Sequence, residues 1–163
     1  DVDSEVSVEV LTAAARHKGA SVVEVLQNCV IFNDGTHSAV ATKENRTENA
    51  ILLEQGKPMI FGKNKEKGLV AEGFNLKVVT IGENGITEKD LLVHDATTED
   101  NTLHQKLANM SYPEFPIALG VIRDVKAPTY DEAVAKQIAE VQAKNPTRKL
   151  KDFLMKGDIW EIK

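Results

Sequence analysis

The beginning of the chain changes from a helical to an extended hydrophobic pattern. Apolar side chains recur with helical spacing over residues 4–17, and Gly19 follows, so this stretch predicts a helix that we expect Ser4 to cap. Residues 21–26 are rich in β-branched side chains and predict a buried strand packed against that helix. A helix followed at once by a strand is an α–β step of a parallel sheet, and we interpret it as the last step of a larger sheet.

The rest of the chain alternates between strand and helix patterns. Residues 36–50 are polar and predict a loop with a short helix, and residues 90–94 fit either a strand or the end of a helix. We expect a mixed sheet downstream, in which the continuous apolar run 117–122 is a central strand. The predicted strands are 59–61, 69–71, 76–81 and 117–122, and the predicted helices are 98–110, 129–144 and 148–155. The fold class is therefore α/β: a truncated parallel-sheet α–β step, residues 1–34, followed by a mixed α+β C-terminal region, residues 35–163.

The composition argues against several classes of function. The 163 residues carry a net charge of −5, which argues against nucleic acid or anionic membranes as partners. The chain contains a single cysteine, so it has no internal disulfide, and we expect a reducing, cytoplasmic location. No apolar run approaches the roughly 20 residues that a membrane-spanning helix needs.

Cys29 lies at the carboxyl end of the predicted strand over 21–26. In open α/β sheets, ligands and cofactors collect beyond the carboxyl ends of strands, so this thiol is a candidate metal ligand or nucleophile. A free cysteine also packs as a small hydrophobic residue, and one thiol alone holds neither zinc nor an iron–sulfur cluster. On the residues alone, the interpretation as a small hydrophobic residue is therefore favoured.

Four other features have structural explanations that compete with functional ones. His17-Lys18-Gly19 falls at a helix C-terminus, where cations offset the helix dipole, so we interpret it as structural. Glu24, in the middle of an apolar strand, is expected at a sheet edge or in a salt bridge. The spacing of His94 and His104 does not place them on one helical face, and we expect surface or capping roles for both. Trp160 fits either a core anchor or an interface, and the sequence leaves both open.

Residues 16–34 resemble part of a known protein family. Their sequence is Arg-His-Lys-Gly-Ala-Ser-Val-Val-Glu-Val-Leu-Gln-Asn-Cys-Val-Ile-Phe-Asn-Asp. Further matching segments follow in order: 53–62, 90–95, 113–121, 128–132 and 156–161. Together these segments resemble the β subunit of 2-oxoacid:ferredoxin oxidoreductases over essentially the whole chain. The 2-oxoglutarate branch of the family is the one they resemble most.

The resemblance implies an enzyme that oxidatively decarboxylates a 2-oxoacid to acyl-CoA and passes electrons to ferredoxin. The implied partners are an α subunit, ferredoxin, the 2-oxoacid and coenzyme A. The implied cofactors of the complete enzyme are thiamine diphosphate, magnesium and a [4Fe–4S] cluster. The family's first three cysteines and its Gly-Asp-Gly…Asn motif are missing here, and the chain starts at Asp1. We therefore expect a carboxyl-terminal part of the β subunit that is inactive alone and binds no cofactor by itself.

Within the resemblance, Cys29 matches the fourth cysteine ligand of the [4Fe–4S] cluster. This implies a metal-ligating role for Cys29 in the complete subunit and an unligated thiol near the surface in this chain alone. No catalytic residue and no residue that binds thiamine diphosphate is expected here. The alternative is a free-standing, non-catalytic module for subunit assembly or binding.

Overall fold

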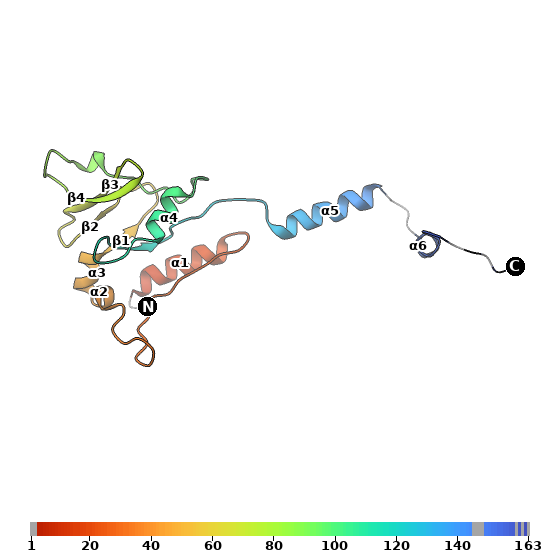
Figure 1. Cartoon of the computed structure of the whole chain (residues 1–163), viewed down its shortest axis with the longest axis horizontal. Helices are drawn as coiled ribbons and strands as arrows, with labels where there is room; N and C mark the ends of the chain where they lie inside the picture. The colour runs from red at the N-terminus through yellow and green to blue at the C-terminus, as the bar shows by residue number, and fades with distance from the viewer. Residues whose placement is uncertain (1–2, 145–148, 159, 161, 163) are drawn as a thin grey trace. The chain divides into compact units, whose positions relative to one another are not determined.

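The computed structural model describes residues 3–144, 149–158, 160 and 162 and divides into two compact units, Asp1–Lys126 and Ala127–Lys163 (Figure 1). Helices, a parallel strand pair and an antiparallel sheet occur together, so the predicted α/β class is confirmed. Among the described residues, no helix combines the length and apolar character that crossing a membrane requires.

Helix α1, Ser4–Arg16, confirms the first predicted element. Its N-cap is Asp3 rather than Ser4, because the Asp3 carboxylate accepts a hydrogen bond from the Val6 amide at 3.3 Å. The stop predicted at Gly19 agrees with the φ of +115° there, a conformation that glycine adopts at low cost.

The strand predicted over residues 21–26 is wrong, because this segment pairs with no strand among the described residues. It belongs to no helix or strand and is largely exposed, and 97% of the Val22 surface is accessible. Glu24 is exposed as well, so the strand edge and salt bridge expected for it are absent from the described contacts. A strand pattern specifies an extended backbone, but only a neighbouring strand can satisfy its peptide groups.

A parallel strand pair lies beside α1 (Figure 1). Two short helices, α2 (Ser38–Ala41) and α3 (Lys43–Asn49), lead into strand β1, Ala50–Leu53. Strand β5, Ile117–Gly120, pairs with β1 in parallel, with Ile51 opposite Ala118 and Leu53 opposite Gly120. The short helix predicted within residues 36–50 is confirmed.

The remaining strands form a separate antiparallel sheet, β2 (Ile60–Phe61), β3 (Lys67–Glu72) and β4 (Asn75–Thr80). The predicted hairpin around the charged turn is confirmed, but the single mixed sheet is wrong. Strand β5 is also not central, because β1 is its only strand neighbour among the described residues. Apolar runs reveal which segments are extended, but not which of them pair.

Two shorter helices lie between β4 and β5 along the chain. Residues 90–94 begin at the end of a helix, because Asp90 is the last residue of the 3₁₀ helix η1, Glu88–Asp90. The residues that follow form no regular strand, and among them Val93 makes an isolated bridge to Pro58. Helix α4, Thr102–Ala108, is shorter than the predicted 98–110. It starts late because Thr97 and Thr98 donate their hydroxyl hydrogens to Asp95 instead of entering a helix.

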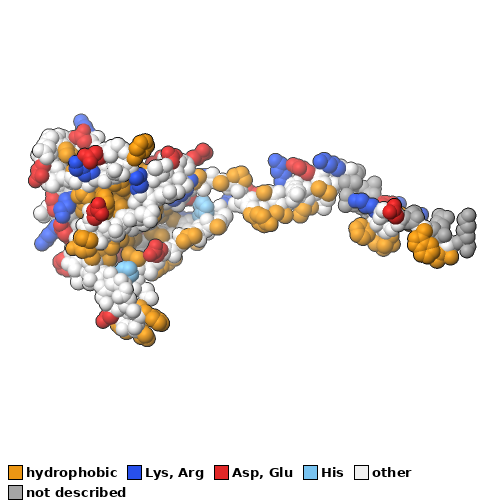
Figure 2. Space-filling model, in the orientation of Figure 1, with side chains coloured by type: hydrophobic (Ala, Val, Ile, Leu, Met, Phe, Trp, Pro, Cys, Tyr) orange, Lys and Arg blue, Asp and Glu red, His pale blue; other side chains and the backbone are white. Residues whose placement is uncertain are grey.

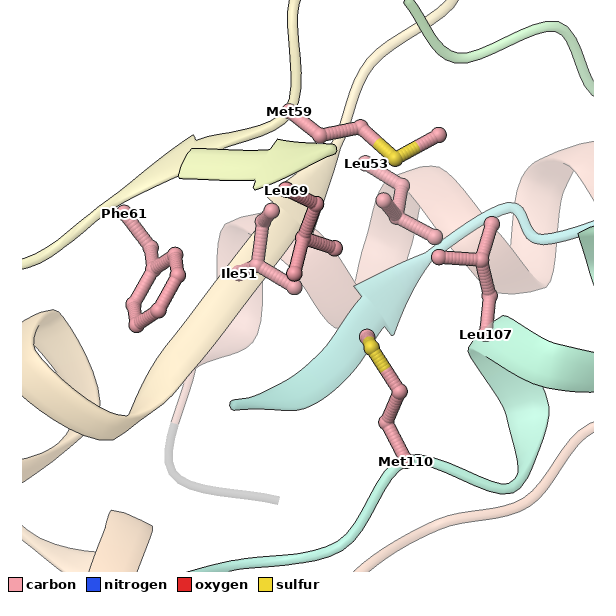
Figure 3. Packing of buried hydrophobic residues seen from close by; sticks show 7 residues of the cluster. All are labelled: Ile51, Leu53, Met59, Phe61, Leu69, Leu107 and Met110. Carbon is pink, nitrogen blue, oxygen red and sulfur yellow. The ribbon is translucent and has the colours of Figure 1, made fainter. Parts of the chain in front are cut away.

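The hydrophobic core joins both sheets to α4 (Figure 3). Ile51 and Leu53 come from β1, while Leu107 comes from α4 and is fully buried. The complete cluster is Ile51, Leu53, Met59, Phe61, Leu69, Leu107 and Met110. This core fixes the carboxyl ends of β1 and β5, where the candidate residues described below are found.

The second unit contains α5, Tyr130–Lys144, and α6, Leu150–Leu154, which confirm helices at the predicted positions 129–144 and 148–155. Residue 148 lies outside the described residues. A capping box between Thr129 and Glu132 starts α5. Figure 2 shows apolar side chains exposed on these helices. Ile138 is 52% exposed and Phe153 is 74% exposed. Trp160 is 82% exposed, so it is no core anchor within the described residues.

Candidate functional site

The loop that carries Cys29 is closed by the side chain of Asn28. The Asn28 amide donates to the Asp34 carboxylate at 2.8 Å, and its carbonyl oxygen accepts from the Gly35 amide at 2.8 Å. Within the loop, the Asn33 amide donates to the Cys29 carbonyl at 3.0 Å. The loop therefore has a defined backbone, which the two hydrogen bonds of the Asn28 side chain close.

Cys29 itself is a free, partly exposed thiol. The next three side chains are strongly exposed, with Phe32 at 89% accessible surface. No group of three or more histidine, cysteine, aspartate or glutamate side chains within the described residues is arranged to hold a metal ion. The loop thus presents one thiol and an apolar tip, and a cluster bound there would need its other ligands from outside this chain.

A second polar cluster lies at the carboxyl ends of β1 and β5. Gln55 follows β1, and Arg123 follows β5. The loop around His94 and Asp95 meets them, because the His94 ring donates from Nε2 to the Val121 carbonyl at 2.9 Å and the Asp124 amide donates to the Ala96 carbonyl at 2.8 Å. Ligands of α/β sheets bind at this edge, so the side chains here are candidates for chemistry.

The hydrogen bonds of His104 assign its tautomer. Arg123 Nη1 donates to His104 Nδ1 at 2.8 Å, and His104 Nε2 lies 2.8 Å from the Asp95 carbonyl oxygen. Because arginine only donates and a carbonyl only accepts, Nδ1 is the acceptor and Nε2 carries the hydrogen. Both ring nitrogens are occupied, so His104 has no lone pair left for a metal.

Asp95 anchors the same corner through its carboxylate. It accepts from Thr97, Thr98 and Gln55, and the Gln55 carbonyl in turn accepts from the Ala96 amide at 2.8 Å. The Thr97 hydroxyl first and the Gln55 amide second hold the pKa of Asp95 well below its usual range. Through these hydrogen bonds, the carboxylate connects the turn after β1 to residues 95–98.

His94 and His104 are buried, which corrects the surface or capping roles expected for them. Their ring centroids are 6.3 Å apart in an edge-to-face arrangement, although the two residues are not neighbours on one helical face. His94 Nδ1 is buried without a hydrogen-bond partner among the described residues. One free acceptor does not make a metal site, so the cluster is a structural corner.

His17 also has a structural contact, as predicted for the His17-Lys18-Gly19 triplet. Its Nδ1 lies 2.7 Å from an Asp124 carboxylate oxygen, which links the end of α1 to the segment after β5. Sequence reasoning missed this link and the Arg123 contacts, because their partners are remote along the chain.

Comparison with known proteins confirms the resemblance predicted from the sequence. The chain is 37% identical over 165 aligned residues to the 2-oxoglutarate oxidoreductase subunit KorB of Mycobacterium tuberculosis. The alignment covers 99% of this chain but 43% of KorB, so the chain spans less than half the length of that relative.

A second relative is similar over a smaller region. Glutamine–fructose-6-phosphate aminotransferase of Buchnera aphidicola is 31% identical over 71 residues, which is 44% of this chain and 12% of that protein. That short match carries no functional argument. No family model and no solved structure matches the chain.

Proposed function

Because the chain is homologous over nearly its whole length to a 2-oxoglutarate oxidoreductase subunit, we propose that it works within the β subunit of a 2-oxoacid:ferredoxin oxidoreductase. The alignment over 99% of the chain is the observation that carries this proposal. The partners are an α subunit, ferredoxin, coenzyme A and a 2-oxoacid, with 2-oxoglutarate as the first candidate. A cytoplasmic location is part of the same proposal.

The proposed reaction removes carbon dioxide and an electron pair from the 2-oxoacid. The acyl group is transferred to the thiol of coenzyme A, and the electrons reduce ferredoxin. Thiamine diphosphate and magnesium are the proposed cofactors of the carbon chemistry. The Gly-Asp-Gly…Asn motif is missing from these 163 residues, so they are not proposed to bind either cofactor alone.

For Cys29 we propose the role of one thiolate ligand to a [4Fe–4S] cluster, which transfers electrons when bound. The closed loop and the partial exposure of the thiol fit a ligand that meets a cluster at the protein surface. Four thiolates hold such a cluster and this chain has one cysteine, so the other three must come from outside these residues.

A non-catalytic assembly or binding module is the second candidate function. It is favoured by the exposed apolar side chains on both units, among them Ile31, Phe32, Phe153 and Trp160. Apolar surface of this kind marks contact sites in soluble proteins. This candidate differs from the first in requiring no oxidoreductase activity from any complex that contains the chain.

Isolation of the native complex through an affinity tag on this chain distinguishes the two functions. Under anaerobic conditions, the complex is assayed for ferredoxin reduction with a panel of 2-oxoacids, with and without coenzyme A. The proposal predicts reduction that requires both coenzyme A and a 2-oxoacid, and it predicts none for the purified 163-residue chain alone. A complex that is inactive with every 2-oxoacid would contradict the enzyme role and support the assembly module.

A further inference from the structure

The face of the β1–β5 pair that points away from the core carries a pocket of about 240 Å³. Successive side chains of a strand point to opposite faces, so Leu52 faces away from the core that buries Ile51 and Leu53. Leu119 lies opposite Leu52 in the register, and Ile60 completes the apolar floor. The floor is therefore made by three different strands.

Three cations line this pocket above the apolar floor. Arg46 comes from α3, and Lys63 and Lys65 come from the turn between β2 and β3. Asp3 is the one carboxylate among the described lining residues, so the lining is net positive in a chain with a net charge of −5. A local positive site in an acidic protein selects anionic ligands by its field.

These cations have few partners of their own. Neither Lys63 nor Lys65 forms an ion pair with another described residue. Arg46 Nε lies 3.7 Å from the Asp3 carboxylate, and its Nη1 donates to the Val40 carbonyl at 3.4 Å, which is a long hydrogen bond. Most donor groups around the pocket are thus available to an incoming anion.

Two acidic side chains next to the pocket already have partners, although the charge of Lys63 also contributes to the lowered pKa of Glu48. Glu48 pairs with Lys67 and also accepts from the Lys63 backbone amide, and the Lys67 contact is the main reason that its pKa is lowered. Glu66 turns back onto the backbone and accepts from the Asn64 amide at 2.7 Å. Both carboxylates are therefore occupied within the turn.

Lys65 lies in the turn with a φ of +56°, in the left-handed region. Its side chain adds a second ammonium group, after that of Lys63, to the residues that line the pocket.

We propose that this pocket binds a phosphorylated ligand with an apolar ring, of which the adenosine diphosphate group is the test case. The phosphates would be held by Lys63, Lys65 and Arg46, and the ring would lie on Leu52, Ile60 and Leu119. The volume is below the roughly 300–1,000 Å³ of pockets for drug-sized ligands, so it accepts one end of a larger molecule. Free ADP and coenzyme A both contain this group. Coenzyme A is a candidate ligand because of the proposed function, whereas ADP binding does not depend on that function.

Equilibrium dialysis of the purified chain against ADP, coenzyme A, adenosine and inorganic phosphate tests the site. We expect ADP and coenzyme A to compete for one site and to bind at least tenfold more tightly than adenosine or phosphate. Tighter binding of coenzyme A than of ADP identifies coenzyme A as the source, and equal binding identifies the ADP group alone. Phosphate binding as tight as ADP binding would overturn the role of the apolar floor.

The double variant Lys63→Gln/Lys65→Gln should weaken ADP binding at least tenfold, because each loses a charge-assisted hydrogen bond. The control Lys18→Gln/Lys89→Gln removes the same charge from exposed lysines outside the pocket and should leave binding unchanged. Leu52→Ser should weaken ADP binding while leaving phosphate binding unaltered. Circular dichroism verifies that each variant is folded.

Equal ADP affinity in the pocket variant and the control variant would overturn the proposal, as would the absence of ADP binding to the folded wild-type chain. Neither outcome affects the proposed oxidoreductase role, which is tested on the native complex by its activity. Conversely, a complex without oxidoreductase activity leaves direct ADP binding to the chain as a separate result.

Discussion

Arg123 and Asp95 each hydrogen-bond several groups that lie far from one another in the sequence. Arg123 donates to the carbonyl oxygens of Thr98 and Glu99, both at 2.9 Å, as well as to His104. These contacts hold the loop before α4 against the segment after β5. Because His104 is almost completely buried, its Nδ1 depends on Arg123 for a donor.

Replacing Arg123 with alanine should destabilise the first unit by about 2 kcal/mol, because it leaves a buried acceptor without a donor. Urea denaturation followed by circular dichroism measures this change. Arg16→Ala, in the exposed last turn of α1, is the matched control and should change stability by less than about 0.5 kcal/mol. Equal midpoints for the two variants would show that the Arg123 contacts do not stabilise the fold.

The lowered pKa of Asp95 predicts how the free energy of unfolding changes in acid. The folded pKa lies below the unfolded value of about 3.9, so the unfolded state binds more protons between the two. The contribution of Asp95 is therefore complete above that unfolded value and is lost as the pH falls through the folded pKa. Asp95→Asn should reduce the stability at neutral pH and flatten its fall below about pH 4.

Urea midpoints of wild type and Asp95→Asn, measured across the acid range, test this directly. Other carboxylates with lowered pKa values, such as Asp100, titrate in both proteins and cancel in the comparison. Parallel curves, separated by a constant difference at every pH, would contradict the assignment.

At the scale of elements, the contact of β1 with β5 limits what can occupy position 120. Gly120 has a φ of +102°, and a Cβ there would lie 2.8 Å from the Leu53 carbonyl oxygen. Backbone atoms in paired strands cannot move aside as a flexible side chain would. Gly82 has a similar φ of +91°, but a Cβ there would meet nothing within 4 Å.

Alanine variants at Gly82 and Gly120 distinguish the cost of backbone strain from the cost of a steric clash. Gly82→Ala should cost about 1 kcal/mol, from the left-handed backbone alone. Gly120→Ala should cost about 1–3 kcal/mol more, because the methyl group forces the strands apart. Urea denaturation of the two variants gives the difference, and equal losses of stability would rule out the clash.

The elements that were predicted correctly are those with local causes. The period of apolar residues identified α1, and the charged turn identified the β2–β3 hairpin. The strand expected at 21–26 requires a neighbouring strand to pair with, and the local sequence does not show whether such a strand is present. The pairing of β5 with β1 and the contact of Arg123 with His104 likewise arise only when distant segments pack, so spacing rules could not find them.

At the scale of the whole molecule, both units expose apolar side chains that a stable partner would cover. Residues 20–28 belong to no helix or regular strand, and Val22 and Val25 are exposed. Hydrogen exchange of the chain alone should therefore be fast there and slow in β1, whose side chains are largely buried. In the native complex, we expect exchange over residues 20–32 to slow.

Mass-spectrometric hydrogen exchange on the chain and on the native complex measures that difference. The turn around Phe74 is an internal control, because Phe74 is 90% exposed but lies outside the loop of Cys29. Equal exchange in both samples over residues 20–32 would show that no partner covers this segment.

We propose that Cys29 ligates a [4Fe–4S] cluster in the native complex, and the decisive measurement is the iron content of a Cys29→Ala complex. Val30→Ala, an exposed neighbour in the same loop, is the control. In the chain alone, Cys29→Ala should change stability by about 1 kcal/mol or less, because the thiol is only partly buried. In the anaerobically purified complex, Cys29→Ala should lose the four-iron EPR signal and the corresponding iron, while Val30→Ala should keep both. A Cys29→Ala complex with wild-type iron content and an unchanged EPR spectrum would contradict the proposal.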